Sequence, residues 1–149
     1  MQIIHIGHWQ FELPDDFSLK PNENSQAYFE NEEGTVGLYL KLIALSEPKP
    51  SATLHAKYIQ EVHLGVFTKG ATNTWEIVDQ RQSTDGYLAR SVLDLYDEAA
   101  NYRVISLVAA TTDMALQTTV HDYWCENYHA SRHQFSDIEA SIVTVASAA

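Results

Sequence analysis

Apolar and polar residues alternate over much of this chain, as they do in strands that bury one face. Within residues 3–13, Trp9, Phe11 and Leu13 alternate with polar neighbours, and Pro14 follows directly. Because proline interrupts a strand, the pattern predicts one strand that ends there.

A hairpin is predicted next. Tyr28 and Phe29 precede the turn-rich stretch Asn-Glu-Glu-Gly at 31–34, and every second residue from Val36 to Leu42 is then apolar. Two extended segments joined by a glycine-containing turn favour antiparallel pairing.

The period changes to that of a helix after Pro50. Ser51 is a residue type that caps helix N-termini, and four apolar residues follow it at steps of four, namely Leu54, Tyr58, Val62 and Val66. A helix is predicted over about 51–69, with Gly70 as its C-terminal cap.

The second half of the chain returns to the strand pattern. Extended segments separated by short polar turns are predicted at 75–82, 87–96, 102–110 and 115–123, which indicates an antiparallel meander. From about residue 131, apolar residues at spacings of three and four predict a second helix packed on the sheet, through Phe135, Ile138, Ile142 and Val145. The predicted fold class is α+β, a single domain over 1–149 with one antiparallel sheet and both helices on one of its faces.

The alternation also predicts which strand face is buried. Leu38, Leu40 and Leu42, or Ala89, Leu93 and Leu95, are natural core positions beneath the helices. The opposite face would then present a mixed aromatic and charged set, made of Tyr39, Lys41, Ile43, Arg90, Val92, Asp94, Tyr96, Gln117, Thr119, His121 and Tyr123. Such a set suits a recognition surface. It is equally typical of an ordinary solvated face, or of one covered by the N-terminal segment.

Charge disfavours two classes of partner. The net charge of -11 over 149 residues repels nucleic acid and anionic membranes. The same acidity either keeps a small protein soluble or favours association with a basic protein. The start of the chain lacks the basic and apolar regions of a signal peptide, no long apolar run follows, and there is one cysteine. A cytoplasmic protein that binds neither nucleic acid nor membrane is expected.

Carboxylates gather in two predicted turns. Glu30, Glu32 and Glu33 surround the first hairpin turn, and Asp94, Asp97 and Glu98 lie near a later one. They are candidates for an acidic contact surface, although solvated turns are commonly acidic as well.

Residues that could carry chemistry are sparse. His121, Cys125, His129 and His133 are spaced by four and include good zinc ligands, but the first is predicted in a strand and the last near a helix. The same cysteine is a candidate nucleophile or a small buried hydrophobe. The six glycines are scattered singly, so no phosphate-binding loop is formed. No catalytic residue, metal or cofactor is assigned, and a zinc-dependent hydrolase stays an alternative.

The chain resembles a known fold over nearly its whole length. The opening Phe-Glu-Leu-Pro-Asp-Asp-Phe at 11–17, the central helix, the meander and the closing Phe135-x-x-Ile138-x-x-Ser141-Ile142 are similar to the PsbP-like fold, specifically to bacterial DcrB-like domains. The resemblance implies a protein that is not an enzyme. Relatives include the Eag chaperones, which cradle hydrophobic segments of type VI secretion effectors, and the resemblance also suggests immunity proteins that neutralise secreted antibacterial toxins.

Two binding functions are therefore expected as alternatives. The first is an immunity protein that binds a basic toxin domain, and the second is an Eag-like chaperone that grips an apolar helix with Tyr39, Ile43, Val92 and Tyr96. The oligomeric state is left open between a monomer and a homodimer. The candidate partner-binding residues are Glu30, Glu32, Glu33, Tyr39, Arg90, Asp94, Tyr96, Asp97 and Glu98.

Overall fold

The computed structural model of the chain describes residues 1–21, 27–69, 72–125 and 128–145. Its elements follow in the order β1 (Gln2–Ile6), β2 (Trp9–Leu13), β3 (Ser18–Lys20), β4 (Ala27–Glu30), β5 (Val36–Ala44), α1 (Ala52–Thr68), β6 (Glu76–Asp85), β7 (Leu88–Asp97), β8 (Tyr102–Ala110), β9 (Met114–Asp122), α2 (Tyr128–Ser141) and β10 (Val143–Thr144). Within α2, the side chains at 128–130 and 132–134 lie outside the description.

The main sheet has seven strands in the order β3-β4-β5-β9-β8-β7-β6, and each neighbouring pair is antiparallel. The predicted hairpin β4–β5 and the predicted meander β6–β9 are confirmed. After β5 the chain crosses to the far edge of the sheet through α1, and β6 to β9 then return strand by strand to pair with β5.

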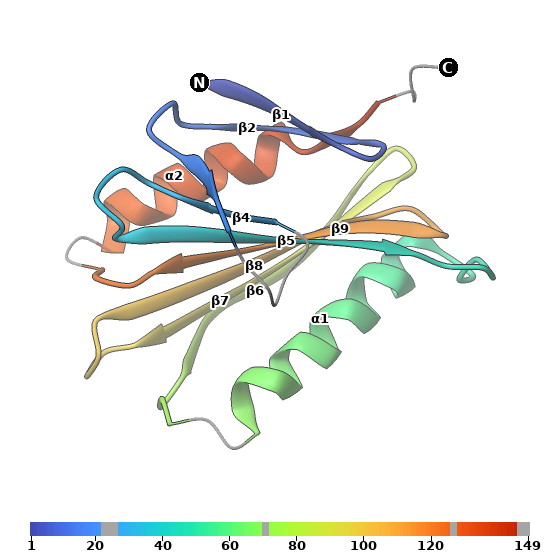
Figure 1. Cartoon of the computed structure of the whole chain (residues 1–149). Helices are drawn as coiled ribbons and strands as arrows, with labels where there is room; N and C mark the ends of the chain where they lie inside the picture. The colour runs from blue at the N-terminus through green and yellow to red at the C-terminus, as the bar shows by residue number, and fades with distance from the viewer. Residues whose placement is uncertain (22–26, 70–71, 126–127, 146–149) are drawn as a thin grey trace.

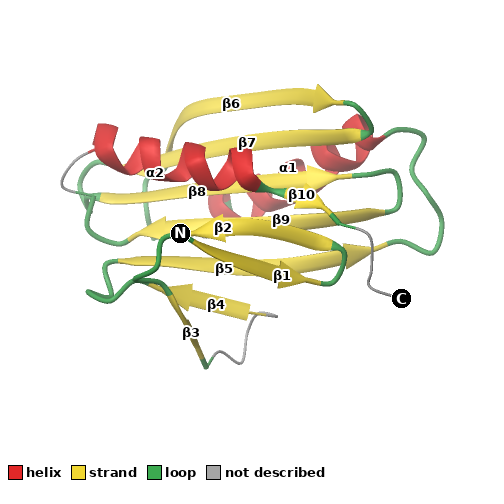
Figure 2. Ribbon diagram, turned by 90° about the horizontal axis from the view of Figure 1, so that it is seen from above, coloured by secondary structure: helices red, strands yellow, loops and turns green. Residues whose placement is uncertain are grey.

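The main sheet is covered on both faces. In Figure 1, α1 lies on one face, whereas α2 and the β1–β2 hairpin lie on the other, and Figure 2 shows the same arrangement from above. A second sheet of three strands, in the order β1-β2-β10, forms part of that second layer. The α+β class is confirmed, but the prediction of one sheet with both helices on one face is wrong. The central strands are apolar at odd and even positions alike, which is typical of a sheet buried on both faces.

The first predicted strand is two strands. β1 and β2 pair antiparallel through a two-residue turn, so that Ile6 lies opposite Trp9. Gly7 in this turn has a φ of 58°, a backbone conformation that glycine adopts without a steric penalty from a Cβ atom. The side-chain alternation continues across the turn, so the pattern alone predicted an unbroken strand.

The second predicted helix is confirmed, but it ends earlier than expected. α2 stops at Ser141, and Val143 and Thr144 then pair with β2 as β10. Of the predicted apolar stripe, Phe135, Ile138 and Ile142 are buried. Val143 and Thr144 are held instead at the edge of the small sheet.

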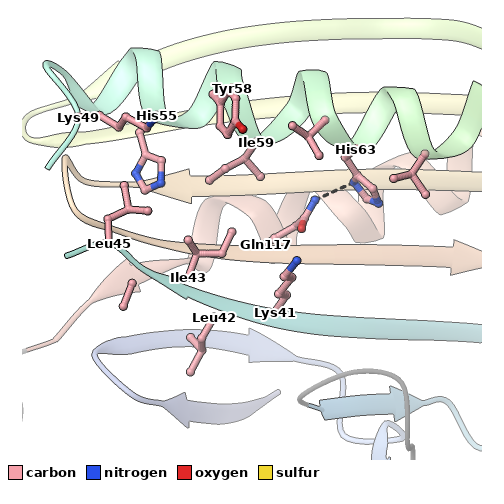
Figure 3. Close-up of a pocket in the computed structure, with 13 residues that line it drawn as sticks. Lys41, Leu42, Ile43, Leu45, Lys49, His55, Tyr58, Ile59, His63 and Gln117 are labelled. Carbon is pink, nitrogen blue, oxygen red and sulfur yellow. Dashed lines mark hydrogen bonds between the residues drawn. The ribbon is translucent and has the colours of Figure 1, made fainter. Parts of the chain in front are cut away.

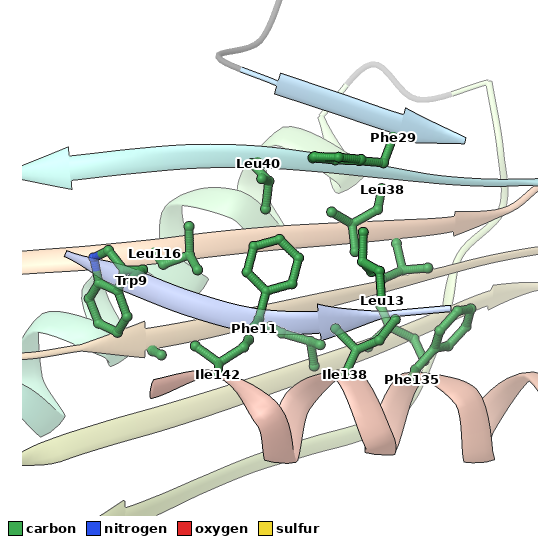
Figure 4. Close-up of a cluster of buried hydrophobic side chains, with 14 of the residues drawn as sticks. Trp9, Phe11, Leu13, Phe29, Leu38, Leu40, Leu116, Phe135, Ile138 and Ile142 are labelled. Atoms are coloured by element: carbon green, nitrogen blue, oxygen red, sulfur yellow. The ribbon is translucent and has the colours of Figure 1, made fainter. Parts of the chain in front are cut away.

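The largest core lies between the main sheet and the layer formed by β2 and α2. Figure 4 shows side chains of both sheets and of α2 meeting there. The labelled members are Trp9, Phe11, Leu13, Phe29, Leu38, Leu40, Leu116, Phe135, Ile138 and Ile142, all of which are buried. Smaller clusters pack α1 on the opposite face.

The central helix begins as the sequence predicts. The Ser51 hydroxyl oxygen accepts a hydrogen bond from the backbone N–H of Leu54 at 3.1 Å, which satisfies one of the free donors of the first turn. The predicted cap residue, Gly70, lies outside the described residues. Within the described part of the chain, neither helix has the length and apolar character needed to cross a bilayer.

Candidate partner-binding groove

The helix α1 has an apolar stripe that does not face the sheet. Its buried residues are His55, Ala56, Ile59 and Gln60. The four apolar residues that the sequence places at steps of four are instead between 51% and 67% exposed, namely Leu54, Tyr58, Val62 and Val66. The helix therefore has apolar residues on a second face, which contacts no core.

A groove of about 630 Å³ runs between this part of α1 and β5. Tyr58, Val62 and Val66 line it from the helix, and Ile43 and Leu45 line it from the strand side. Figure 3 shows side chains from the helix and from β5 facing this groove, with Gln117 of β9 between them. It is a largely apolar, open concavity whose volume lies in the usual range of ligand-binding pockets.

His63 is held in the groove as a neutral imidazole. Its Nδ1 atom accepts a hydrogen bond from Gln117 Nε2 at 2.7 Å and lies 2.7 Å from the Ser106 hydroxyl oxygen. Burial, assisted by the positive charge of Lys41, lowers the pKa of His63 to about 4. The proton of the neutral ring is therefore assigned to Nε2 at neutral pH.

Aromatic side chains extend from this groove along the same face of the sheet. The ring centroid of His63 lies 4.7 Å from that of Phe67. From Phe67, a row of neighbouring aromatic rings extends to Tyr28. Neighbouring ring centroids along it are 4.4 to 5.8 Å apart, through Phe67, Trp75, Tyr102, Tyr123, His121, Tyr39 and Tyr28. The row places large rings beside the groove, of which Tyr28 is buried and the others are partly buried, and aromatic residues are common in recognition surfaces.

His121, Tyr102 and Tyr123 of this row are held uncharged. His121 Nδ1 lies 2.5 Å from the Tyr102 hydroxyl, and burial, with a smaller effect from His63, lowers the pKa of His121 to about 4. Burial likewise raises the pKa of Tyr102, and raises that of Tyr123 to about 12. At neutral pH these rings are polar through hydrogen bonds rather than through charge.

Acid is expected to destabilise the protein through these two histidines. Because the folded pKa of His63 and of His121 lies below that of a free histidine, the unfolded chain binds their protons more tightly. The stability they contribute is full above pH ~6.5 and is lost as the pH falls towards ~4, by roughly 1–2 kcal/mol each after allowance for partial solvent exposure. Urea unfolding at several pH values measures this.

The control for this pH dependence is the double variant His63→Gln/His121→Gln, which removes both titrating groups. Its unfolding free energy should fall less steeply between pH ~6.5 and ~4 than that of the wild type. Parallel curves would contradict the assignment, because the acid sensitivity would then come from other groups.

The predicted mixed face is divided between the two faces of the main sheet. Tyr39 pairs with Thr119 and lies on the α1 face with the aromatic row. Arg90 is directed to the other layer, where it donates to the carbonyl oxygens of Glu139 at 2.8 Å and Ile142 at 2.6 Å. The prediction that these residues share a face is therefore wrong.

Two further residues of the predicted surface lie on that opposite face and belong to the core or its edge. Asp94 is 3% exposed and pairs with Arg103 at 2.6 Å, and Val92 belongs to the large core cluster. Tyr96 is half-buried at the end of β7. The prediction that Tyr39, Ile43, Val92 and Tyr96 form one surface that grips a helix is therefore wrong. The even-numbered residues of β7 face the layer of β2 and α2, whereas the alternation predicted them on the same face as Tyr39.

The two predicted acidic turns lie at the same end of the main sheet. The strand register forms one row across the sheet from Val36, Asp122, Arg103 and Tyr96. Val36 directly follows the first acidic turn, and Tyr96 directly precedes the second. Glu32, Glu33 and Glu98 are exposed there, and Glu30 is half-buried and accepts a hydrogen bond from the Tyr28 hydroxyl at 2.8 Å.

Asp97 has a structural role at this acidic end. Its carboxylate accepts hydrogen bonds from the Asn73 side chain at 2.9 Å and from the backbone N–H groups of Thr74 and Ala100 at 3.3 Å each. The bond from Asn73 lowers the pKa of Asp97. With Trp75 and Tyr96 it borders a hollow of about 520 Å³.

The histidine and cysteine residues do not form a group that the structure can assign. The side chains of His129 and His133 lie outside the described residues. Cys125 is buried near the Ser131 hydroxyl, and burial raises the pKa of its thiol, which lowers its reactivity as a nucleophile. Among the described side chains, no three His, Cys, Asp or Glu residues gather as metal ligands would.

The groove itself was not predicted, although the sequence contains a signal for it. α1 has apolar residues at Leu54, Tyr58, Val62 and Val66, and a second set that includes Ala56, Ile59 and Phe67. A helix that packs on a sheet through one face needs only one such set. The excess of apolar positions indicates that a second face is available for another contact.

Comparison with known proteins identifies the fold. No protein-family model matches the chain, and no curated protein matches it. Among solved structures, it is similar to the solution structure of cyanobacterial PsbP (CyanoP) from Synechocystis sp. PCC 6803, with a TM-score of 0.68 and 11% sequence identity over 92% of this chain and 86% of that chain. The chain thus has a PsbP-like fold, as the resemblance predicted. At this identity the likeness concerns the fold alone.

Proposed function

We propose that this protein is a non-enzymatic binding protein that holds an apolar helix of a partner protein in the groove beside α1. The observation that supports the proposal is the row of exposed apolar residues Tyr58, Val62 and Val66 along one edge of the groove, which continues the stripe that begins at Leu54. From Tyr58 to Val66 the helix rises by about 12 Å. A partner helix of similar length can lie against such a row with its own residues spaced by three and four.

The stripe differs from ordinary surface exposure. Single exposed apolar residues are common on folded proteins, whereas contiguous apolar patches usually mark an interaction site. Here Tyr58, Val62 and Val66 face the same concavity as Ile43 of β5, so a helix laid between them would contact apolar surface on both sides. Burial of that surface would supply the driving force for association.

A chaperone of the Eag type is the form of this function that the sequence resemblance suggests. In that role the protein would act in the cytoplasm and shield an apolar segment of a type VI secretion effector before export. The aromatic row next to the groove supports this reading, since half-exposed rings such as Tyr39 and Tyr102 extend the contact surface beyond the stripe. The proposal is compatible with a monomer or a homodimer.

An immunity protein is the second candidate, supported by a different surface. Glu32, Glu33 and Glu98 are exposed on two turns that lie at the same end of the main sheet. With a net charge of -11, this end is suited to a folded, basic toxin domain, whose association would be accelerated by the opposite charges.

Substitutions in the two surfaces are expected to separate these functions. Partners are captured from a host lysate on immobilised protein, and the bound segment is identified by crosslinking and mass spectrometry. If the groove is used, the captured segment is an apolar helix, and Val62→Asp weakens its binding at least tenfold because a carboxylate must then be buried in the contact. Val62 is 52% exposed, so the substitution leaves the fold intact.

Two controls accompany this measurement. Ile3→Asp places the same charge at an apolar position of similar exposure on β1, far from the groove, and should leave binding unchanged. The pair Glu32→Lys/Glu33→Lys should also leave it unchanged. Capture of a folded basic domain that is lost on these reversals and at high salt, but not on Val62→Asp, would instead favour the immunity function.

A further inference from the structure

The charge of the groove is opposite to that of the protein. The chain has 20 acidic and 9 basic residues. Among the residues that the structure describes, those lining the groove include Lys41 and Lys49 but neither an aspartate nor a glutamate. Neither lysine forms a salt bridge with the described part of the chain. The apolar groove is therefore locally basic in an acidic protein.

The two lysines lie at different positions along the groove. Lys49 Nζ is 4.8 Å from the centre of the Tyr58 ring, near the start of α1. Lys41 of β5 lies opposite Gln117 of β9 in the strand register. The Gln117 side chain donates a hydrogen bond to His63, which is further along α1. Tyr58 and His63 are separated by a helical rise of about 7.5 Å, or about 1.4 turns. Figure 3 shows Lys49 beside the start of α1 and Lys41 on β5 below Gln117.

A buried ring nitrogen of His55, at the Lys49 end of the groove, is a second observation that favours a polar group on the partner helix. His55 is 1% exposed, and its Nδ1 atom lies 2.8 Å from the carbonyl oxygen of Thr111. Its Nε2 atom is buried and has no hydrogen-bond partner among the described residues. Buried polar atoms are rarely left unpaired, so each such atom calls for an explanation. His55 lines the groove, so a polar group of an occupant at the Lys49 end would lie next to this ring.

We infer that the helix held in this groove carries carboxylates on its apolar face, about one turn apart, which pair with Lys41 and Lys49. The inference rests on the proposed function and names the chemistry of its partner. An entirely apolar helix would cover two ammonium groups without compensation, which is unfavourable. Aspartate or glutamate at positions i and i+4, about 6 Å apart along a helix, would offset that cost and fix the register and direction of the partner.

The test uses synthetic helical peptides of about 16 residues, roughly 24 Å long, so that no natural partner has to be known. Their apolar stripe is leucine at every fourth position, and their outer face is uncharged. One peptide carries glutamate at i and i+4 on the stripe side, one carries glutamine there, and one carries lysine there. Affinity is measured by fluorescence anisotropy with the full chain.

The glutamate peptide is expected to bind at least about tenfold more tightly than the glutamine peptide, a difference typical of charge-assisted hydrogen bonds. The advantage should shrink with added salt. In the variant Lys41→Glu/Lys49→Glu, the order should invert, with the lysine peptide now the tightest. The control Lys20→Glu/Lys57→Glu makes the same change in net charge at exposed positions outside the groove lining and should keep the original order.

The possible outcomes separate the inference from the function on which it rests. Equal binding of the glutamate and glutamine peptides, both lost on Val62→Asp, overturns the inference and leaves the groove as an apolar helix site. Inversion of the order by both lysine double variants also overturns it, because net charge alone would then decide affinity. Binding of none of the peptides overturns the inference and the proposed groove function together.

Discussion

Replacing Arg103 by methionine is expected to lower the free energy of unfolding by about 3–5 kcal/mol, because it leaves a buried carboxylate unpaired. Arg103 is 0% exposed, and its guanidinium donates to both oxygens of Asp94, at 3.0 and 2.6 Å. It also donates to the Ser131 hydroxyl at 3.1 Å and lies over the Phe135 ring, so it joins α2 to the sheet. Chemical denaturation measures the loss.

A second substitution tests the cause of that loss. In the double variant Arg103→Met/Asp94→Leu no buried charge remains, and most of the lost stability should return. Arg81→Met is the matched control, because Arg81 pairs with Asp79 at 2.7 Å but is 52% exposed, and its loss should cost less than about 1 kcal/mol. Similar losses for Arg103→Met and Arg81→Met would contradict the argument.

The pairing of Asp94 with Arg103 could not be predicted from the sequence. Asp94 stands next to the acidic turn that contains Asp97 and Glu98, and proximity along the chain suggested a shared exposed surface. Its partner is on the neighbouring strand, and α2 covers both. Which residues meet depends on strand register and on the face that each helix covers, and neither is determined by local periodicity.

Local patterns predicted the individual elements well. Alternation placed the strands of the meander, and Ser51 marked the start of α1, because side-chain period and capping depend on nearby residues. The layers could not be obtained in this way. In β7 and β8 both faces are apolar, so the pattern gives no preference for the side on which a helix packs.

The same ambiguity concealed the groove. The four residues from Leu54 to Val66 look like the core face of α1, yet the structure buries the set that contains His55 and Gln60. Gln60 is held there by hydrogen bonds from its side chain to the carbonyl oxygens of Ser91 at 3.1 Å and Ser106 at 2.8 Å. Polar residues thus share the sheet-facing side of α1 with Ala56 and Ile59, and Tyr58, Val62 and Val66 are left for the groove.

The core between the main sheet and the layer of β2 and α2 lies on the face opposite the groove. A substitution in this core should therefore lower the stability of the protein without altering the groove. Phe11→Ala is expected to lower the free energy of unfolding by about 3–5 kcal/mol, because the ring is lost from a closely packed core. Phe11 is 0% exposed on β2, and it packs in the cluster that joins the small sheet and α2 to the main sheet. Thermal or chemical unfolding measures the change.

Ile3→Ala is the matched control for Phe11→Ala, since Ile3 lies on the same hairpin but is 56% exposed, and its truncation should change stability by less than about 0.5 kcal/mol. A small effect of Phe11→Ala would mean that the N-terminal hairpin contributes little to the core.

Phe11 packs on the face of the main sheet opposite α1, so the folded fraction of the variant should bind a groove peptide with wild-type affinity. Loss of stability with unchanged affinity would show that the N-terminal layer supports the fold, while recognition depends on the α1 face alone.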